Sequence, residues 1–220
     1  MSTRAPDPIS RRVRRQPSRG RYDRAAIDAV LDKGIVAHLA FVDGEQPYCI
    51  PMLYARIGDH VYIHGSTASR LIRTLASGAR ACLTSTTLNG LVLARSVFEH
   101  SANYESVALF GTLREVTEPD ERLAAFEAFT NKLLPGRWDE ARHPNRKELK
   151  ATRILALAID AASAKMRSGP PTDDDSEDAS LDVWAGELPI VTTFGEPVPS
   201  PGLRAGIALP ESVRRLTDAA

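Results

Sequence analysis

The chain has 220 residues, of which 43% are hydrophobic, and its 28 basic and 28 acidic residues give a formal net charge of zero. This length suits one domain with a tail, and the hydrophobic content excludes wholesale disorder. A neutral chain lacks the basic excess of a dedicated nucleic-acid binder. No apolar run is long enough to span a membrane, and the N-terminus lacks the apolar stretch of a secretory signal. We therefore expect a cytoplasmic protein that binds neither nucleic acid nor membrane.

The charges are unevenly distributed along the chain. Residues 1–21 contain seven arginines and one acid, whereas residues 172–182 contain six acids and no base. An ionic contact between the basic end of one subunit and the acidic stretch of another is one hypothesis for these opposed segments. The composition predicts the following division: a basic flexible arm over 1–21, a folded domain over 22–167, and an acidic, proline-rich tail over 168–220 with an apolar docking segment at 183–190.

The predicted elements begin with a helix from Asp23 to Lys33, in which Asp23 is the N-cap and Gly34 the terminator. A helix follows at 70–77, and another at 119–134 with Leu123, Phe126, Phe129 and Leu133 on one face. Strands are predicted at 35–42, 46–57, 60–64, 79–87 (with an extension over 90–94), 106–116 and 154–159. Because the first three strands have no helix between them, the pattern favours a small antiparallel barrel over a doubly wound parallel sheet.

Neither cysteine nor histidine usage indicates a metal site. Cys49 and Cys82 each lie in an apolar run, which predicts buried free thiols. The five histidines are scattered, and none has a carboxylate at metal-ligand spacing.

The segment His64 to Arg73 is a candidate anion site. A strand ends there in glycine and hydroxyl residues and turns directly into a helix, whose first N–H groups attract anions. Arg70 and Arg73 add guanidinium groups suited to phosphate. The alternative is ordinary N-capping by Ser69 with solvated arginines, and the pattern alone leaves both open.

Three further segments carry groups that suit a site. Residues 89–106 form a predicted polar connection that includes His100 and Tyr104, and a functional loop is as consistent with it as a structural one. Lys165 and Arg167 alternate at strand spacing, which favours a solvated strand face. Trp184 suits stacking on a planar ligand, although a hydrophobic plug is the commoner role for such a residue.

The motifs IPMLYAR, YIHGSTASR, NGLVLARS, HSANYES and VWAGELP, spread over residues 22–190, give the chain a recognisable pattern. It resembles the pyridoxamine 5′-phosphate oxidase-like FMN-binding split barrels, and most closely their flavin-nucleotide-binding or nitroimidazole-resistance-type branch. The resemblance implies a mainly β (α+β) fold, a six-stranded antiparallel split β-barrel with flanking helices.

The resemblance also implies a homodimer with FMN at the subunit interface and a set of contacts to it. The residues it assigns are Ile50, Pro51, Met52 and Leu53 along the flavin ring, His64, Gly65, Ser69 and Arg70 at the phosphate, Thr84, Ser85 and Thr86 on the next strand, and Trp184 near the partner's flavin.

The resemblance places the substrate segment of the oxidase at Phe98 to Ser106. That stretch lacks the oxidase's arginine and contains two glutamates, which predicts a small-molecule substrate other than pyridoxamine phosphate. His100 and Tyr104 are the candidates for proton transfer. The function expected is an FMN-dependent oxidoreductase. The alternatives are a non-catalytic flavin carrier or sensor, and a split barrel that binds haem or deazaflavin in place of FMN.

Overall fold

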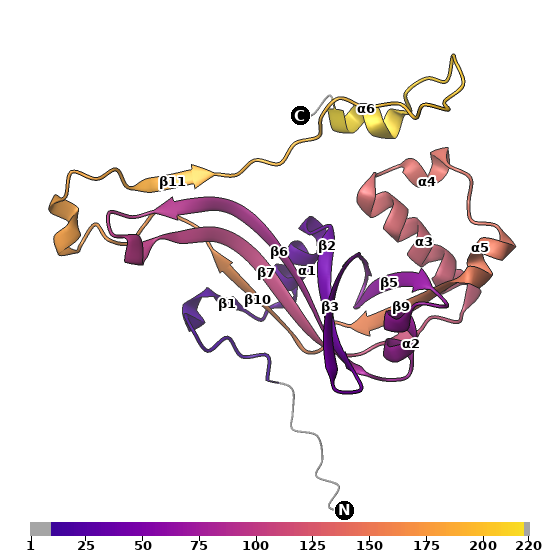
Figure 1. Ribbon diagram of the computed structural model, residues 1–220, viewed down its shortest axis with the longest axis horizontal. Helices are drawn as coiled ribbons and strands as arrows, with labels where there is room; N and C mark the ends of the chain where they lie inside the picture. Colours follow the sequence, from indigo (N-terminus) through magenta and orange to yellow (C-terminus); the bar gives the residue numbers. More distant parts are fainter. Residues whose placement is uncertain (1–9, 218–220) are drawn as a thin grey trace, which may run out of the picture.

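The computed structural model describes residues 10–217, which form two antiparallel sheets with helices around them (Figure 1). The larger sheet has the order β1-β10-β7-β6-β2-β3, with β11 added along β6, and the smaller has the order β4-β5-β9-β8. Strand bounds in the larger sheet are Gly20–Arg21 (β1), Val36–Asp43 (β2), Gln46–Leu53 (β3), Arg80–Leu93 (β6), Ser101–Thr112 (β7), Ala162–Arg167 (β10) and Gly186–Pro189 (β11). Those in the smaller are Ala55–Ile57 (β4), His60–Ser66 (β5), Arg114–Glu115 (β8) and Thr152–Ala158 (β9).

The helices flank the barrel, as predicted. Their bounds are Arg24–Lys33 (α1), Arg70–Ala76 (α2), Pro119–Leu133 (α3), Arg137–Glu140 (α4), Arg146–Ala151 (α5) and Glu211–Thr217 (α6), with 3-10 turns at Pro17–Arg19 (η1), Val97–Glu99 (η2) and Glu177–Ser180 (η3). The mainly β, antiparallel split-barrel architecture is therefore confirmed. The described residues form eleven strands instead of six, because short pairings and divided strands escape a periodicity pattern.

Helix α1 follows its sequence signals closely. The Asp23 side chain accepts a hydrogen bond from the Ala26 N–H, and the Gly34 N–H donates to the Val30 carbonyl. The apolar side of the helix, including Val30 and Leu31, is buried in the main core. The helix prediction is confirmed because its capping residues and its apolar face agree with each other.

Two predictions for apolar residues need correction. In α3, Phe129 is buried beside Ala125, but Leu123 and Leu133 are exposed, because only a narrow stripe of this helix packs on the smaller sheet. Cys49 is exposed on β3, whereas Cys82 is partly buried, and burial raises the pKa of its thiol. An apolar run on an edge strand does not ensure burial, because one side of that strand has no neighbour.

The predicted single strand over 46–57 is wrong, since the chain leaves one sheet for the other at Tyr54. β3 ends at Leu53 and β4 starts at Ala55, and the two belong to different sheets. The Tyr54 side chain is buried at the crossing and donates a hydrogen bond to the Leu31 carbonyl at 2.8 Å. Neither glycine nor proline marks this position, so the local pattern cannot reveal the break.

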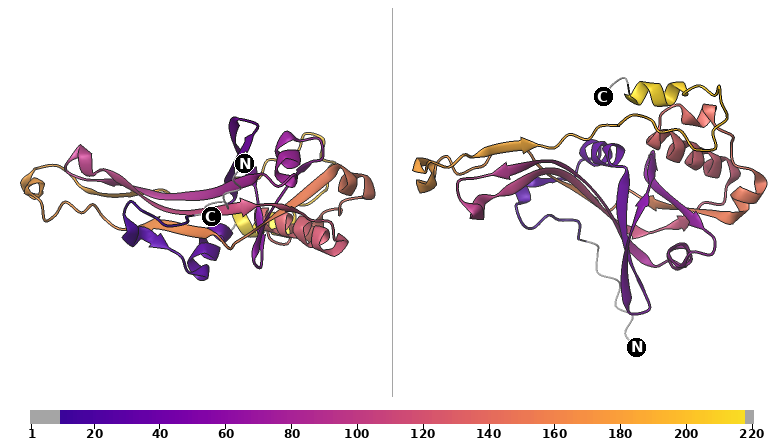
Figure 2. Two further views of the ribbon diagram at one scale, coloured as in Figure 1. Left: turned by 90° about the horizontal axis from the view of Figure 1, so that it is seen from below. Right: turned by 45° about the horizontal axis from the view of Figure 1, so that its top comes forward.

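The predicted loop over 89–106 is mostly a long hairpin. β6 runs to Leu93 and β7 begins at Ser101, with a register irregularity between Leu88 and Gly90. Figures 1 and 2 show this hairpin reaching far beyond the barrel, with β10 and β11 along it. The polar side chains predicted a connecting loop, but in the structure most of this segment belongs to two paired strands.

The predicted apolar docking segment, residues 183–190, contacts a strand of the same chain. β11 pairs with β6 from Gly186 opposite Leu93 to Pro189 opposite Gly90, beyond the stretch of β6 that pairs with β2. A Cβ on Gly90 would lie 3.0 Å from the Leu188 carbonyl oxygen, so glycine permits this close approach. The segment thus extends the larger sheet.

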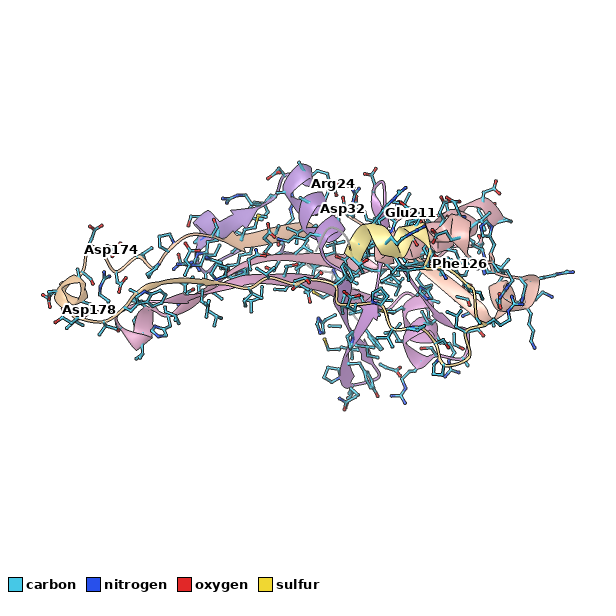
Figure 3. The ribbon with its side chains drawn as sticks, turned by 90° about the horizontal axis from the view of Figure 1, so that it is seen from above. Arg24, Asp32, Phe126, Asp174, Asp178 and Glu211 are labelled. Atoms are coloured by element: carbon cyan, nitrogen blue, oxygen red, sulfur yellow. The ribbon has the colours of Figure 1, made fainter. Side chains whose placement is uncertain are left out.

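The charged segments also take definite positions. The Asp173 carboxylate accepts a hydrogen bond from the Arg95 N–H at 2.7 Å, and Asp174 pairs with the Arg95 guanidinium at 2.9 Å. In Figure 3, Asp174 and Asp178 lie at the far end of the long sheet. Within residues 10–217 of one chain, the ion pairs of the acidic stretch go to Arg95, and the predicted contact between subunits stays a prediction.

The predicted arm begins with nine residues that lie outside the described residues. Its remainder includes η1 and β1, which pairs with β10 at Gly20 and Lys165. The larger sheet therefore starts two residues before the predicted domain boundary. In the part of the chain described, no helix is long and apolar enough to cross a membrane.

Candidate functional site

Strand β3 forms one edge of the larger sheet. Ile50 to Leu53 pair with Leu39 to Val36 of β2, and no other described strand lies along the outer edge of β3. Alternate backbone N–H and C=O groups therefore point away from the sheet. Pro47 and Pro51 interrupt this row of donors, which disfavours addition of another strand. The edge is suited to hydrogen bonding with a planar heterocycle.

Strand β6, which is separated from β3 by β2, carries three of the predicted contact residues. Pro51, His38 and Thr84 lie opposite one another across β3, β2 and β6, which puts Thr84 in the same cross-strand row as the predicted ring contact. Thr86 is exposed on the same strand. Ser85 is only 1% exposed, and its hydroxyl donates to the Val36 carbonyl at 2.9 Å. The structure therefore groups Thr84 with β3 and turns Ser85 into the core.

Arg70 lies close to β3 at the start of α2. Its Nη1 donates to the Tyr48 hydroxyl at 2.5 Å, and its guanidinium carbon is 5.1 Å from the centre of the Tyr48 ring. Arg70 and Arg73 share a cavity of about 340 Å³. Ser69 occupies the N-cap position, but its side chain makes no capping hydrogen bond. The two guanidinium groups predicted for an anion site therefore lie together, with the Asp43 carboxylate in the lining of the same cavity. The capping alternative lacks its expected side-chain bond.

The predicted pair His64 and Gly65 is divided by the alternation of β5. Gly65 faces α2, where an added Cβ would lie 2.8 Å from Ile72 Cγ1. His64 points to the opposite side, with its ring centroid 4.5 Å from that of Phe129. Gly65 therefore allows α2 to approach β5, and His64 belongs to a different site from Arg70.

His64 faces a cavity of about 450 Å³ between β5, the β3–β4 crossing and α3. Its lining is mostly apolar and comprises Leu53, Tyr54, His64, Phe126, Phe129, Thr130, Leu133, Leu134 and Arg137. Figure 3 shows Phe126 on this side of the molecule. Because Leu53 is the last residue of β3, the cavity adjoins the edge strand described above.

The His64 imidazole has an unusual environment. Its Nδ1 atom is buried without a hydrogen-bond partner among the described residues, and burial lowers the pKa of the ring. The imidazole is therefore neutral near pH 7 and retains lone-pair character suited to a metal. Within residues 10–217 no group of three or more histidine, cysteine or acidic side chains is placed to hold a metal ion. A metal at His64 would have to arrive with other ligands, as in a cofactor.

The proposed catalytic residues His100 and Tyr104 do not converge. His100 lies at the tip of the long hairpin, where its Nδ1 is 3.0 Å from the Ser96 carbonyl oxygen. Tyr104 is four residues away along the hairpin, a distance of about 13 Å for an extended chain. Neither His100 nor Tyr104 lies with the predicted contact residues at the edge of β3. Trp184 is 66% exposed beside Gly186, next to β11.

Asn103, between these two residues, has a role that the pattern did not indicate. Its amide donates to the Glu187 carboxylate at 2.5 Å and accepts a hydrogen bond from Arg167, which also donates to the Gly169 carbonyl. This network joins β7, β10 and β11. The solvated-face prediction is wrong for Arg167, because these partners come from segments distant in sequence. Tyr48 was missed for a similar reason, since its contact with Arg70 depends on how α2 packs.

Comparison with known proteins adds a family assignment to this geometry. The family model for pyridoxamine 5′-phosphate oxidase matches residues 23–166. The chain belongs to this family. A search of curated proteins finds no match.

Two solved structures in particular resemble this member of the oxidase family. The flavocytochrome Anf3 from Azotobacter vinelandii is 35% identical, with a TM-score of 0.86 and coverage of 93% of this chain and 94% of its own. An FAD and heme binding protein from Mycobacterium smegmatis is 41% identical, with a TM-score of 0.85 and coverage of 90% and 97%. A 5-nitroimidazole antibiotic resistance protein from Bacteroides thetaiotaomicron, 17% identical with a TM-score of 0.56 over 66% of this chain and 85% of its own, shares the fold.

Proposed function

We propose that this protein is a flavin-binding oxidoreductase of the flavocytochrome type, with a flavin at the edge of β3 and a haem beside His64. The observation that carries the proposal is the buried, unpartnered Nδ1 atom of His64 beside an apolar cavity next to the edge strand. The relatives at 35% and 41% identity are a flavocytochrome and an FAD and heme binding protein, which supports the same pair of groups.

The residues near β3 suit a flavin. Backbone groups of Ile50 to Leu53 would bond the ring, and Thr84 would border it from β6. Arg70, assisted by Arg73, would bind a phosphate of the flavin. The predicted cofactor was FMN, but the relative at 41% identity is described as binding FAD, so we favour FAD for this chain.

The cavity at His64 suits a haem. The imidazole would bind the iron, and the phenylalanine rings of α3 would contact the porphyrin. Arg137 lines the same cavity and would bind a carboxylate of the porphyrin. When bound, a flavin supplies two-electron chemistry and a haem iron supplies one-electron chemistry. Leu53 contacts both sites and would hold the two groups near each other.

The homodimer remains part of this proposal. Exposed apolar side chains gather on β6 and β11, where Leu91 lies opposite Leu188 and Ile190 follows. Clusters of exposed apolar side chains are typical of interaction surfaces. A second copy on this face would also cover Trp184. The substrate, an unidentified small molecule, would reach the flavin from the side that the second copy leaves open.

The absorption spectrum of the purified protein tests the proposal. We expect flavin bands together with a haem Soret band, and release of the flavin followed by chromatography should identify FAD. Protein that stays colourless after incubation with flavin and haemin would contradict the proposal. A flavin spectrum without haem uptake would restrict the proposal to the flavin site. A deazaflavin spectrum would show that deazaflavin, and not a flavin, is the bound cofactor.

Two substitutions separate the sites. His64→Ala should abolish the Soret band and leave flavin content unchanged, whereas Arg70→Ala should weaken flavin binding by about 1.5–3 kcal/mol because a charged hydrogen-bond donor is lost. His60→Ala is the matched control on the same strand, and it should retain both groups. Haem retained at wild-type level in His64→Ala would remove His64 as the ligand.

A further inference from the structure

The arginines near the start of the chain contribute to a third cavity, far from the proposed flavin and haem sites. This cavity has a volume of about 390 Å³, and its lining includes Arg19, Arg21 and Arg167 together with Ser18, Ser168 and Thr172. It lies at the β1–β10 edge of the larger sheet, and β3 forms the opposite edge. The cavity is therefore separate from the proposed flavin edge of the same subunit.

The local fold brings these guanidinium groups together. Gln16 has a φ of 56°, which turns the chain into η1, and Gly20 and Arg21 then pair with Lys165 and Ala164 of β10. The Tyr22 hydroxyl accepts a hydrogen bond from the Val13 N–H at 2.8 Å and holds the preceding segment against this turn. Arg167 ends β10 on the same side. Three basic residues from two distant parts of the sequence thus face one cavity.

Among residues 10–217 no carboxylate forms an ion pair with these three arginines, although the charge of Glu187 acts favourably on Arg167. Arg21 donates to the carbonyls of Ser18 and Gly20, and Arg167 donates to amide and carbonyl oxygens. The nearby acids Asp173 and Glu187 are hydrogen bonded to Arg95 and Asn103. Burial and the like charge of Arg19 lower the pKa of Arg167. An anion in the cavity would relieve this repulsion.

We propose that this arginine cavity binds a small phosphorylated molecule through its phosphate group. Guanidinium groups bind phosphate oxygens in pairs, and the three hydroxyls supply further donors. The half-buried position of Arg19 and Arg167 and the limited volume fit a diphosphate better than an extended polyanion. This site goes beyond the flavin and haem function, because it uses neither β3 nor the His64 cavity.

Calorimetric titration of the purified, cofactor-loaded protein with inorganic pyrophosphate tests this proposal. We expect one site per chain, and Arg19→Gln should raise the dissociation constant by about tenfold, because a charged hydrogen-bond donor is lost. Arg14→Gln is the matched control, since it removes the same charge from the same segment without lining the cavity. Sulfate at equal concentration should bind more weakly, since it presents fewer oxygens to the three arginines.

The result also distinguishes the sources of the phosphate. If loading with FAD blocks pyrophosphate binding and loading with FMN does not, the cavity holds the diphosphate of a flavin dinucleotide. If neither blocks it, a separate phosphorylated molecule is the ligand. The proposal is overturned if pyrophosphate binds neither the FAD-loaded nor the FMN-loaded protein, or if Arg14→Gln and Arg19→Gln weaken binding equally, which would indicate diffuse charge attraction. Because flavin and haem content are read from the spectrum, failure here is independent of the proposed function.

Discussion

Lys132 shows how one residue of this protein combines two opposed effects. Its ammonium group donates to the Leu31 carbonyl at 2.6 Å, near the C-terminal end of α1, and lies 4.2 Å from the centre of the Tyr54 ring. A cation is favourable at a helix C-terminus. Burial nevertheless lowers the pKa of Lys132 from 10.5 to about 8. Desolvation therefore outweighs the favourable contacts.

This shift predicts a pH dependence of stability. Between pH 8 and 10.5 the unfolded chain keeps the Lys132 proton while the folded chain releases it, so the free energy of unfolding should rise with pH in this window. Lys132→Met should remove this contribution and make the protein more stable than wild type at pH 7.5. Urea unfolding of both proteins at pH 7.5, 9 and 10 measures this difference in stability.

Lys150→Met is the control for this pH series, since Lys150 is exposed on α5. Its pH profile should match that of the wild type. If the free energies of unfolding of wild type and Lys132→Met differ by the same amount at every pH, Lys132 is not the cause of the pH dependence. The raised thiol pKa of Cys82 acts in the opposite direction, but it is common to every variant and cancels in the comparison.

At the scale of elements, β11 shows how a strand from the tail becomes part of the sheet. Its four residues pair with β6, and its Glu187 accepts a hydrogen bond from the buried Asn103 amide. Arg167 donates to the same Asn103 side chain. Four residues provide few ladder bonds, so this side-chain network is the specific link that fixes β11 on the hairpin.

Asn103→Ala should therefore loosen β11. The substitution leaves Glu187 and Arg167 without their shared partner and should cost about 1–3 kcal/mol. Hydrogen exchange should become faster at the β11 amides, while the amides of α1 should keep wild-type rates. Asn89→Ala is a suitable control, because its amide contacts Glu105 and Lys33 outside this network. Unchanged exchange in β11 would show that the backbone ladder alone holds the strand.

At the scale of the whole molecule, the long hairpin and β11 extend beyond the barrel (Figures 1 and 2). Leu188 is exposed on β11 opposite Leu91 of β6, and Leu88 and Ile190 are exposed nearby. The proposed homodimer would bury these side chains. A charge placed among them would be desolvated without a partner on association.

Leu188→Asp should shift the protein from dimer to monomer. Sedimentation velocity over a range of concentrations measures this change, and we expect an increase of at least about tenfold in the dimer dissociation constant, since burial of an unpaired charge costs several kcal/mol. Val198→Asp serves as the control, because Val198 is exposed in the tail outside this face. A wild-type protein that remains monomeric would contradict the dimer.

Much of the secondary structure was predictable from local sequence. α1 was set by Asp23, its apolar spacing and Gly34. Arg70 lies against Tyr48 of the predicted ring strand, and its role at a phosphate stays a prediction. The caps and apolar spacing of α1 depend on neighbours within a few residues.

Other features were decided only when distant segments packed together. The division of the second strand at Tyr54 depends on a hydrogen bond to α1, and the burial of Arg167 depends on Asn103 of β7. His64 was predicted at a phosphate, but strand alternation directs it to the cavity below α3. The sequence by itself determined the type of the longer elements, such as α1 and β2, because these follow from local propensity and periodicity. The tertiary structure decided which partner each face meets, because that depends on packing across the whole chain.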